Sequence, residues 1–204
     1  MSTSRNFTTG FVLSKWDLHM MCAARFFGSW SKCMSRHIGA VIVADKRIIS
    51  TGYNGPPEGA LHCDSYDRIM EIISSFYNAP VALDTADKLL RHRGQCPRKI
   101  LGFKSGEGLH ICTAAHAETN AIVNAARDGS RVRGATMYCY CPHPCFECTK
   151  LIINAGIRRV FFLDGVSYDS QGPLLFKAVN TELIPVRKEL VDQHYLELDS
   201  QWNM

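Results

Sequence analysis

Apolar residues at helical spacing mark the first regular segment of the chain. The stretch SKWDLHMMCAARFF, which begins at Ser14, repeats apolar positions at intervals that line one face of a helix. Ser14 and Asp17 also have the spacing of a capping box, in which each residue hydrogen-bonds the backbone N–H of the other. The pattern predicts a helix from Ser14 to about Ser29.

Hydrophobic runs of a different kind follow. Two β-rich runs, Ile38 to Ala44 and Arg47 to Gly52, are joined by the polar turn Asp45-Lys46 and predict a β-hairpin. Helical and strand patterns alternate again later in the chain, which is typical of an α/β fold whose sheet is covered on both faces. The expected elements are a helix at His116 to Ala126, a strand at Ala135 to Cys141, a helix at Cys145 to Ala155 closed by Gly156, a strand at Arg158 to Leu163, a helix at about Gly172 to Asn180 and a strand at Glu182 to Val186.

The interval from Gly55 to Gly108 interrupts this alternation. It is rich in proline and glycine and holds two weakly amphipathic helical pieces, around Tyr66 to Phe76 and Thr85 to Arg91. We therefore predict an insertion at about 60–110 and a C-terminal tail from about 188. The length of 204 residues, 46% of them hydrophobic, suits a single domain over 1–204 that carries both embellishments.

The composition narrows the class of protein. No stretch approaches the roughly 18 apolar residues of a membrane helix, and the N-terminal stretch MSTSRNFTTG lacks the apolar run of a secretory signal. We expect a cytoplasmic protein with no membrane partner, in the host cytoplasm if the source is a phage. A net charge of +4 without a polybasic tail favours a small anionic substrate over a nucleic acid polymer.

The strongest chemical signal is a pair of motifs, His116-Ala117-Glu118 and Pro144-Cys145-Phe146-Glu147-Cys148. Each opens a predicted helix, where cysteines at i and i+3 direct their sulfurs to one side and the helix dipole favours thiolates. Three nitrogen and sulfur ligands, His116, Cys145 and Cys148, are typical of a catalytic zinc that keeps a fourth position for water. Glu118 lies two residues after the histidine and is the candidate general acid/base.

Either motif alone has an ordinary explanation. A lone CxxC is often a structural zinc knuckle or half of a redox pair, and a lone HAE on a helix usually has no function. Both motifs, in this order and at helix starts within an α/β pattern, favour the catalytic site. Nine cysteines, an odd number in an expected cytosolic chain, also favour metal binding over a disulfide framework.

The combination HAE and PCFEC resembles the H-x-E and P-C-x-x-C signature of zinc nucleobase deaminases, and within them the deoxycytidylate (dCMP) deaminases of bacteriophage and bacterial type. The resemblance implies a three-layer α/β/α cytidine-deaminase-like fold with a central mixed sheet of about five strands. It is carried by Ser31 to Val43 (SKCMSRHIGAVIV), Gly52 to Gly59 (GYNGPPEG), His116 to Arg127 (HAETNAIVNAAR) and Gly134 to Phe162 (GATMYCYCPHPCFECTKLIINAGIRRVFF).

The resemblance also implies an activity. A zinc-activated water attacks the amino-bearing carbon of the cytosine ring, Glu118 moves the protons, and dCMP becomes dUMP and ammonia, which supplies dUMP for thymidylate synthesis. Asn54 resembles the family asparagine that binds the sugar, although Asn-Gly is also a common turn pair. Ser31, Lys32 and Arg36 are candidate phosphate donors and could equally be surface groups.

The family resemblance extends to regulation. It implies a homohexamer that dCTP activates and dTTP inhibits, with Mg²⁺ accompanying the triphosphate. The GYNG residues Gly52, Tyr53, Asn54 and Gly55 are candidates for the effector site. Arg127 is a further candidate, although a cation at a helix C-terminus is also explained by the helix dipole.

A second, structural zinc is a further implication of the resemblance. Its candidate ligands are Cys33, Cys63, His110 and Cys112. A glutamate ligand of one relative falls at Ala114, which cannot bind metal, so Cys112 or His62 would replace it. The alternative is that these are ordinary buried thiols and hydrogen-bonded histidines. Cys22, Cys139 and Cys141 are expected in the core, and Cys96 has no assignment.

Two other functions compete. The same chemistry could act on cytidine, tRNA adenosine or single-stranded DNA, although polymer substrates call for a basic, aromatic-lined channel. The chain could instead be a zinc-stapled module that senses nucleotides without catalysis. Glu118 argues against this second alternative, because a structural metal site gains little from an unligated carboxylate.

Overall fold

The computed structural model describes residues 12–63, 65–76, 79–92, 94–165, 169–179 and 181–202. The polar N-terminal stretch MSTSRNFTTG and Asn180, the expected end of a helix, lie outside these ranges. The chain divides into two compact units. Unit one contains the chain up to Ser31, Ile38–Tyr53 and the residues from His116 onward, and unit two contains Lys32–His37 and Asn54–Ala115.

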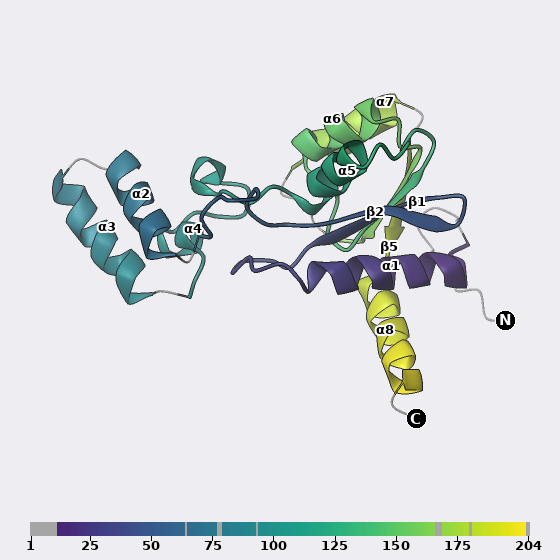
Figure 1. Ribbon diagram of the computed structural model, residues 1–204, viewed down its shortest axis with the longest axis horizontal. Coiled ribbons are helices and arrows are strands. Elements are labelled where there is room, and N and C mark those ends of the chain that lie inside the picture. The colour runs from purple at the N-terminus through teal and green to yellow at the C-terminus, as the bar shows by residue number, and fades with distance from the viewer. Residues whose placement is uncertain are drawn as a thin grey trace. The chain divides into compact units, whose positions relative to one another are not determined.

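Unit one is built on a mixed sheet of five strands in the order β2-β1-β3-β4-β5 (Figure 1). Strands β2, β1 and β3 are antiparallel, whereas β3, β4 and β5 are parallel, so the predicted mixed sheet of about five strands is confirmed. The strands are β1 (Gly39–Ala44), β2 (Arg47–Tyr53), β3 (Thr136–Cys139), β4 (Arg159–Leu163) and β5 (Glu182–Val186).

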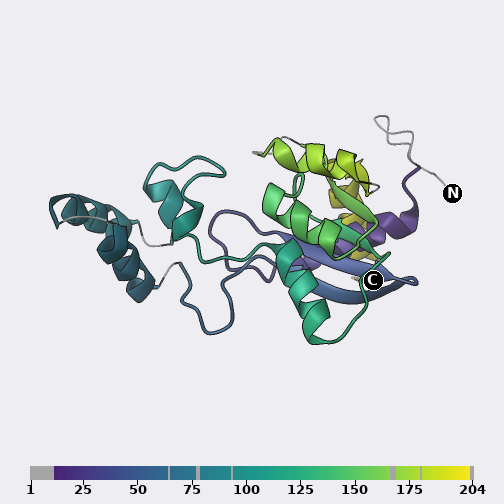
Figure 2. The same cartoon turned by 90° about the horizontal axis from the view of Figure 1, so that it is seen from above.

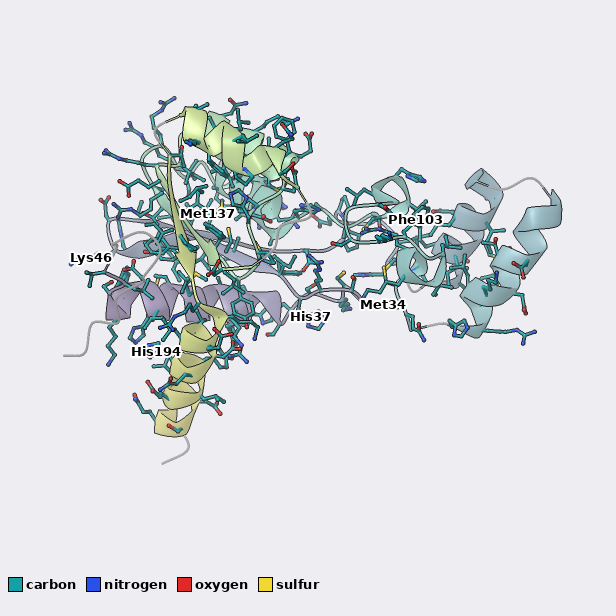
Figure 3. The ribbon with its side chains drawn as sticks, turned by 180° about the vertical axis from the view of Figure 1, so that it is seen from behind. Met34, His37, Lys46, Phe103, Met137 and His194 are labelled. Carbon is teal, nitrogen blue, oxygen red and sulfur yellow. The ribbon has the colours of Figure 1, made fainter. Side chains whose placement is uncertain are left out.

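Helices cover both faces of this sheet, which confirms the predicted three-layer α/β/α fold (Figures 1 and 2). One layer contains α5 (Ala117–Arg127), α6 (Phe146–Asn154) and α7 (Gln171–Ala178). The other contains α1 (Lys15–Gly28) and α8 (Lys188–Trp202). Helix α8 can be found in Figure 3 by the label of His194.

Strand periodicity divides the core between the two faces. Ala40 and Ile42 belong to the core cluster that contains Ala117 and Ala121 of α5, whereas Val41 belongs to the cluster that contains residues of α1. Successive side chains of a strand point to opposite faces, so one buried strand supplies both clusters. Met137 of β3, labelled in Figure 3, lies on the α5 side and is fully buried.

Local chemistry explains the start of the fold. Ser14 and Asp17 form the predicted capping box at the start of α1, and Asp17 also accepts a hydrogen bond from the Tyr138 hydroxyl at 2.8 Å. The predicted hairpin turns at Asp45 and Lys46, which have φ values of 49° and 58°. Two adjacent residues with positive φ give a turn whose twist matches that of the paired strands.

Gly52 permits α5 to lie directly on β2. A Cβ atom at this position would come within 2.3 Å of the Ala117 carbonyl oxygen and 2.4 Å of the Ala121 nitrogen. The side-chain amides of Asn120 and Asn124 donate to the carbonyls of Tyr53 and Thr51 at 2.8 Å and 2.9 Å. This close packing fixes the helix that has His116 as its N-cap and Glu118 in its first turn.

Unit two contains α2 (Tyr66–Phe76), α3 (Ala79–Arg91), α4 (Pro97–Ile100) and the 3₁₀ turn η1 (Leu109–Ile111). Helix α2 has the predicted bounds. Helix α3 begins at Ala79, earlier than the predicted Thr85, and the proline at position 80 falls in its first turn, where a missing N–H is tolerated. A small cluster of buried residues forms its core: Ile69, Ile72, Ile73, Leu89 and Ile111. A single domain with an insertion at about 60–110 stays a prediction.

The tail from 188 forms α8, a helix that the sequence analysis did not assign. Val191 is fully buried in the cluster on the α1 side of the sheet, with Tyr195 and Leu198 packed against the same cluster. The spacing of four and three residues between these apolar side chains is typical of one face of a helix and could have predicted α8. No helix in the described ranges has the length and apolar character needed to cross a membrane.

Candidate metal centre

Three donor atoms from two helix starts lie together in unit one. His116 is the N-cap of α5, and Cys145 is the N-cap of α6, three residues before Cys148. Neither N-cap side chain caps its own helix. The Nδ1 atom of His116 and the two sulfurs lie within 4.8 Å of one another.

These spacings fit a zinc ion. The His116 Nδ1 atom lies 3.3 Å from each sulfur. Tetrahedral ligation with Zn–N of about 2.1 Å and Zn–S of about 2.3 Å separates nitrogen from sulfur by roughly 3.6 Å. A shift of a few tenths of an ångström would therefore suffice, and one imidazole with two thiols is a donor set that zinc prefers. Their role as ligands stays a prediction.

The pKa values of the two cysteine thiols shift in opposite directions. A hydrogen bond from Cys148 lowers the pKa of the Cys145 thiol to about 3, and the charge of His116 acts in the same direction. The same hydrogen bond and burial raise the pKa of Cys148. A divalent cation is the kind of charge that would favour the thiolate form of both sulfurs at once.

Glu118 lies in the first turn of α5 and is only 3% exposed. Burial raises the pKa of its carboxyl group, whereas the charge of His116 opposes this shift. Its Oε1 atom accepts a hydrogen bond from the Cys141 thiol at 3.7 Å. A buried carboxyl group with a raised pKa is suited to proton transfer near neutral pH.

Asp169 supports the cysteine turn and was missed by the sequence analysis. Its carboxylate accepts a hydrogen bond from the backbone N–H of Phe146, the first residue of α6, and another from Gln171 at 2.8 Å. Burial opposes the shift, but bonds from backbone N–H groups lower the pKa of Asp169. It replaces the missing cap of α6, since Cys145 does not cap its own helix. No local pattern links Asp169 to a helix 23 residues earlier.

A second group of donors surrounds Glu118. Its carboxyl group and the sulfurs of Cys139 and Cys141 lie within 4.8 Å of one another, and all three residues are buried. Burial raises the pKa of Cys139. A hydrogen bond with Cys139, followed by burial, raises that of Cys141. The expected core position of these two cysteines is confirmed, and their raised pKa values favour the protonated thiol.

The candidate phosphate and sugar residues are divided between the units. Ser31, which is buried, belongs to unit one, whereas Lys32, Arg36 and Asn54 belong to unit two. Within unit two, the buried Asn54 side chain donates to the Arg36 carbonyl at 2.9 Å, and the Arg36 guanidinium donates to Ser105 at 2.8 Å. Asn54 therefore ties its loop to the Lys32–His37 segment of unit two, and its sugar-binding role stays a prediction.

Within unit one, the candidate regulatory residues do not come together. Tyr53 lies beside Asn120, in the first half of α5, whereas Arg127 is the last residue of that helix. Seven helical residues span about 10 Å. Arg127 helps line a pocket of about 390 Å³ formed by residues 48–51 of β2 and the end of α5.

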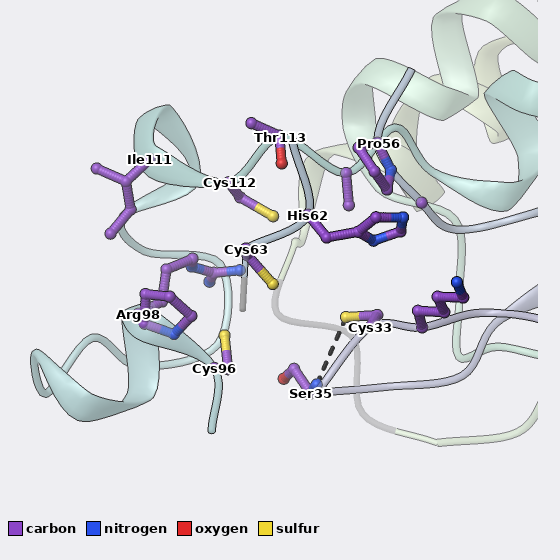
Figure 4. A pocket seen from close by; sticks show the side chains of 14 residues that line it. Cys33, Ser35, Pro56, His62, Cys63, Cys96, Arg98, Ile111, Cys112 and Thr113 are labelled. Atoms are coloured by element: carbon purple, nitrogen blue, oxygen red, sulfur yellow. Dashed lines mark hydrogen bonds between the residues drawn. The ribbon is translucent and has the colours of Figure 1, made fainter. Parts of the chain in front are cut away.

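Four cysteines of unit two face one small cavity of about 40 Å³. Figure 4 shows the sulfurs of Cys33, Cys63, Cys96 and Cys112 around the same space. The backbone N–H of Ser35 donates to the Cys33 sulfur at 3.5 Å. His62 also lines the cavity. His110 is absent from its described lining and packs its ring against Phe103, with centroids 6.1 Å apart.

Comparison with known sequences gives a consistent result. The family model described as the cytidine and deoxycytidylate deaminase zinc-binding region matches residues 14–164. The deoxycytidylate deaminase of Enterobacteria phage T2 is 36% identical over 152 residues, which are 70% of this chain and 76% of the phage protein. That of Schizosaccharomyces pombe is 32% identical over 82% of this chain, but this chain spans only 43% of the yeast protein.

Comparison with solved structures supports the fold. The dCMP deaminase of cyanophage S-TIM5 in its apo form superposes with a TM-score of 0.56 and 20% sequence identity. The match covers 85% of this chain and 99% of the cyanophage chain.

Proposed function

Because the chain belongs to the cytidine and deoxycytidylate deaminase family, we propose that it hydrolyses dCMP to dUMP and ammonia and so supplies dUMP for thymidylate synthesis. The observation that carries the proposal is that the donor atoms of His116, Cys145 and Cys148 lie close together, in the same unit as the buried carboxyl group of Glu118. The names of the phage and yeast relatives support dCMP as the substrate.

The residues of the centre divide the chemistry. His116, Cys145 and Cys148 would hold zinc, which acts in such sites as a Lewis acid and makes water a nucleophile at neutral pH. Glu118 takes a proton from the attacking water and gives it to the ring nitrogen beside the reacting carbon. It then carries the second proton of that water to the amino group. The carbon–nitrogen bond breaks, a carbonyl replaces it, and ammonia leaves.

Ammonia release tests the substrate directly. The purified protein should act on dCMP with a kcat/KM at least about tenfold above that for deoxycytidine, cytidine and dCTP. The expected reason is that relatives named for dCMP act on a monophosphate, and one charge-assisted contact to that phosphate is worth a factor of about ten. Equal turnover of deoxycytidine would contradict the nucleotide assignment. Turnover of a tRNA or single-stranded DNA substrate instead would favour the competing deaminase class.

We also propose that the enzyme is a cytoplasmic homohexamer regulated by nucleotides. The support is the family resemblance and the pocket beside Arg127, whose guanidinium could pair with phosphate.

The ammonia-release assay tests this regulation. Addition of dCTP with Mg²⁺ should raise the rate at low dCMP concentration, and dTTP should lower it. Arg127→Ala should weaken both responses, and light scattering should give the mass of six chains.

For unit two we propose a structural zinc. The four sulfurs around its small cavity support a site formed by Cys33, Cys63, Cys96 and Cys112, in which Cys96 takes the place expected for His110. No three of these donors lie within 4.8 Å of one another among the described residues, so they would have to draw closer around the ion.

Metal analysis of Cys96→Ser tests this second site. The wild-type chain should hold two zinc ions, and the variant should hold one, because a serine hydroxyl does not ionise near neutral pH and is a poor zinc ligand. Its melting temperature should fall, while the metal of the catalytic site stays bound. Cys22→Ser is the matched control, since Cys22 is a buried thiol of unit one that donates to the Val191 carbonyl. Two zinc ions in Cys96→Ser would contradict the proposed ligand set.

A further inference from the structure

The carboxyl group of Glu118 is held by an unusual donor. The Cys141 sulfur lies 3.7 Å from Glu118 Oε1, a normal distance for a hydrogen bond from sulfur, and the two residues are 4% and 3% exposed. A buried carboxylate without a donor is costly, and a buried polar atom is nearly always hydrogen-bonded. The carboxyl group also receives a hydrogen bond from its own backbone, and among the described residues Cys141 provides the side-chain hydrogen bond to it.

The backbone aims this thiol at Glu118. Cys141 is the second residue after the end of β3, and the Leu163 N–H donates to its carbonyl at 2.8 Å, so neighbouring strand β4 fixes its backbone. Cys139 lies two residues earlier and points to the same side of the sheet, as strand periodicity requires. The two sulfurs and the carboxyl group therefore lie together in one buried cluster.

The direction of the hydrogen bonds follows from donor capacity. A thiol has one proton, and a carboxylate oxygen is a stronger acceptor than a sulfur atom. Cys141 therefore donates its proton to Glu118. Both thiols stay protonated, since both have raised pKa values.

We propose that Cys141 is a positioning residue whose thiol fixes the rotamer of the Glu118 carboxyl group. One carboxyl oxygen is then held against the sheet, and the other is presented to the water and to the pyrimidine. The inference rests on the proposed function only for its consequence, which is efficient proton transfer. A side chain that must deliver two protons in sequence loses rate when its orientation is not fixed.

An isosteric pair of variants tests the donor. Cys141→Thr keeps an O–H group, whereas Cys141→Val has the same shape with a methyl group in its place. We expect kcat on dCMP about tenfold lower for Cys141→Val than for Cys141→Thr, the usual effect of one lost hydrogen bond, with similar KM and equal zinc content. The same pair at Cys22, a buried thiol in the other core cluster, should show equal kcat values.

Crystal structures of the two variants give a readout independent of turnover. The carboxyl group of Glu118 should keep its rotamer in Cys141→Thr and rotate in Cys141→Val. Equal kcat values in the two variants, or the same Glu118 rotamer in both, would overturn the positioning role. Failure of the wild-type protein to release ammonia from dCMP would instead overturn the proposed function, and the rotamer comparison would still decide the role of Cys141.

Discussion

Glu118→Gln is expected to lower kcat on dCMP about 10³-fold while the zinc content and the fold stay unchanged. Glutamine has nearly the same shape as glutamate and can still accept the hydrogen bond from Cys141 through its amide oxygen. It has no carboxylate to take a proton from water. The substitution therefore removes proton transfer and leaves the metal centre intact.

Steady-state rates, metal analysis and a melting curve check this expectation together. Glu147→Gln is a matched control, because Glu147 lies between the two candidate ligand cysteines in the sequence but is exposed and pairs only with Lys150 at 2.6 Å among the described residues. The control should keep the wild-type rate. Turnover within tenfold of wild type in Glu118→Gln would remove Glu118 from the mechanism.

Cys148→Ser is expected to have the other large effect, the loss of one zinc ion per chain and of turnover. Cys148 is 2% exposed, and its sulfur lies 3.3 Å from His116 Nδ1, so no water could easily take its place as a ligand. A serine hydroxyl stays protonated near neutral pH and does not replace a thiolate. The rate should fall more than about 10³-fold, since the Lewis acid would be lost.

The same substitution at Cys22 separates metal loss from a general packing effect. Cys22→Ser should retain both zinc ions and the wild-type kcat, even if its melting temperature falls by a few degrees, because Cys22 belongs to the core cluster on the α1 side. Full zinc content in Cys148→Ser, measured after dialysis, would exclude Cys148 from the ligand set.

The elements that the sequence predicted well are those whose own residues determine them. The capping box of Ser14 and Asp17, the hairpin turn at Asp45-Lys46 and the five strands follow from local patterns. The boundaries were less accurate. Strand β3 ends at Cys139, although Tyr140 and Cys141 continue to bond neighbouring strands through single backbone hydrogen bonds.

The features that escaped prediction depend on contacts between distant segments. Asp169 caps a helix that begins 23 residues earlier, and Cys96 meets Cys33 and Cys63 only through the folding of unit two. The hydrogen bond between Cys141 and Glu118 likewise joins residues that are 23 positions apart. A single sequence shows residue types and spacing along the chain, and none of these three contacts leaves a periodic pattern.

The central claim is that His116, Cys145 and Cys148 hold a zinc ion beside an unligated Glu118. Anomalous diffraction from crystals of the purified protein, recorded on both sides of the zinc absorption edge, tests it most directly. A peak about 2.1 Å from His116 Nδ1 and about 2.3 Å from each sulfur, with a water as fourth neighbour, is the expected result. No peak at these three atoms, or a fourth protein ligand that closes the site, would contradict the account.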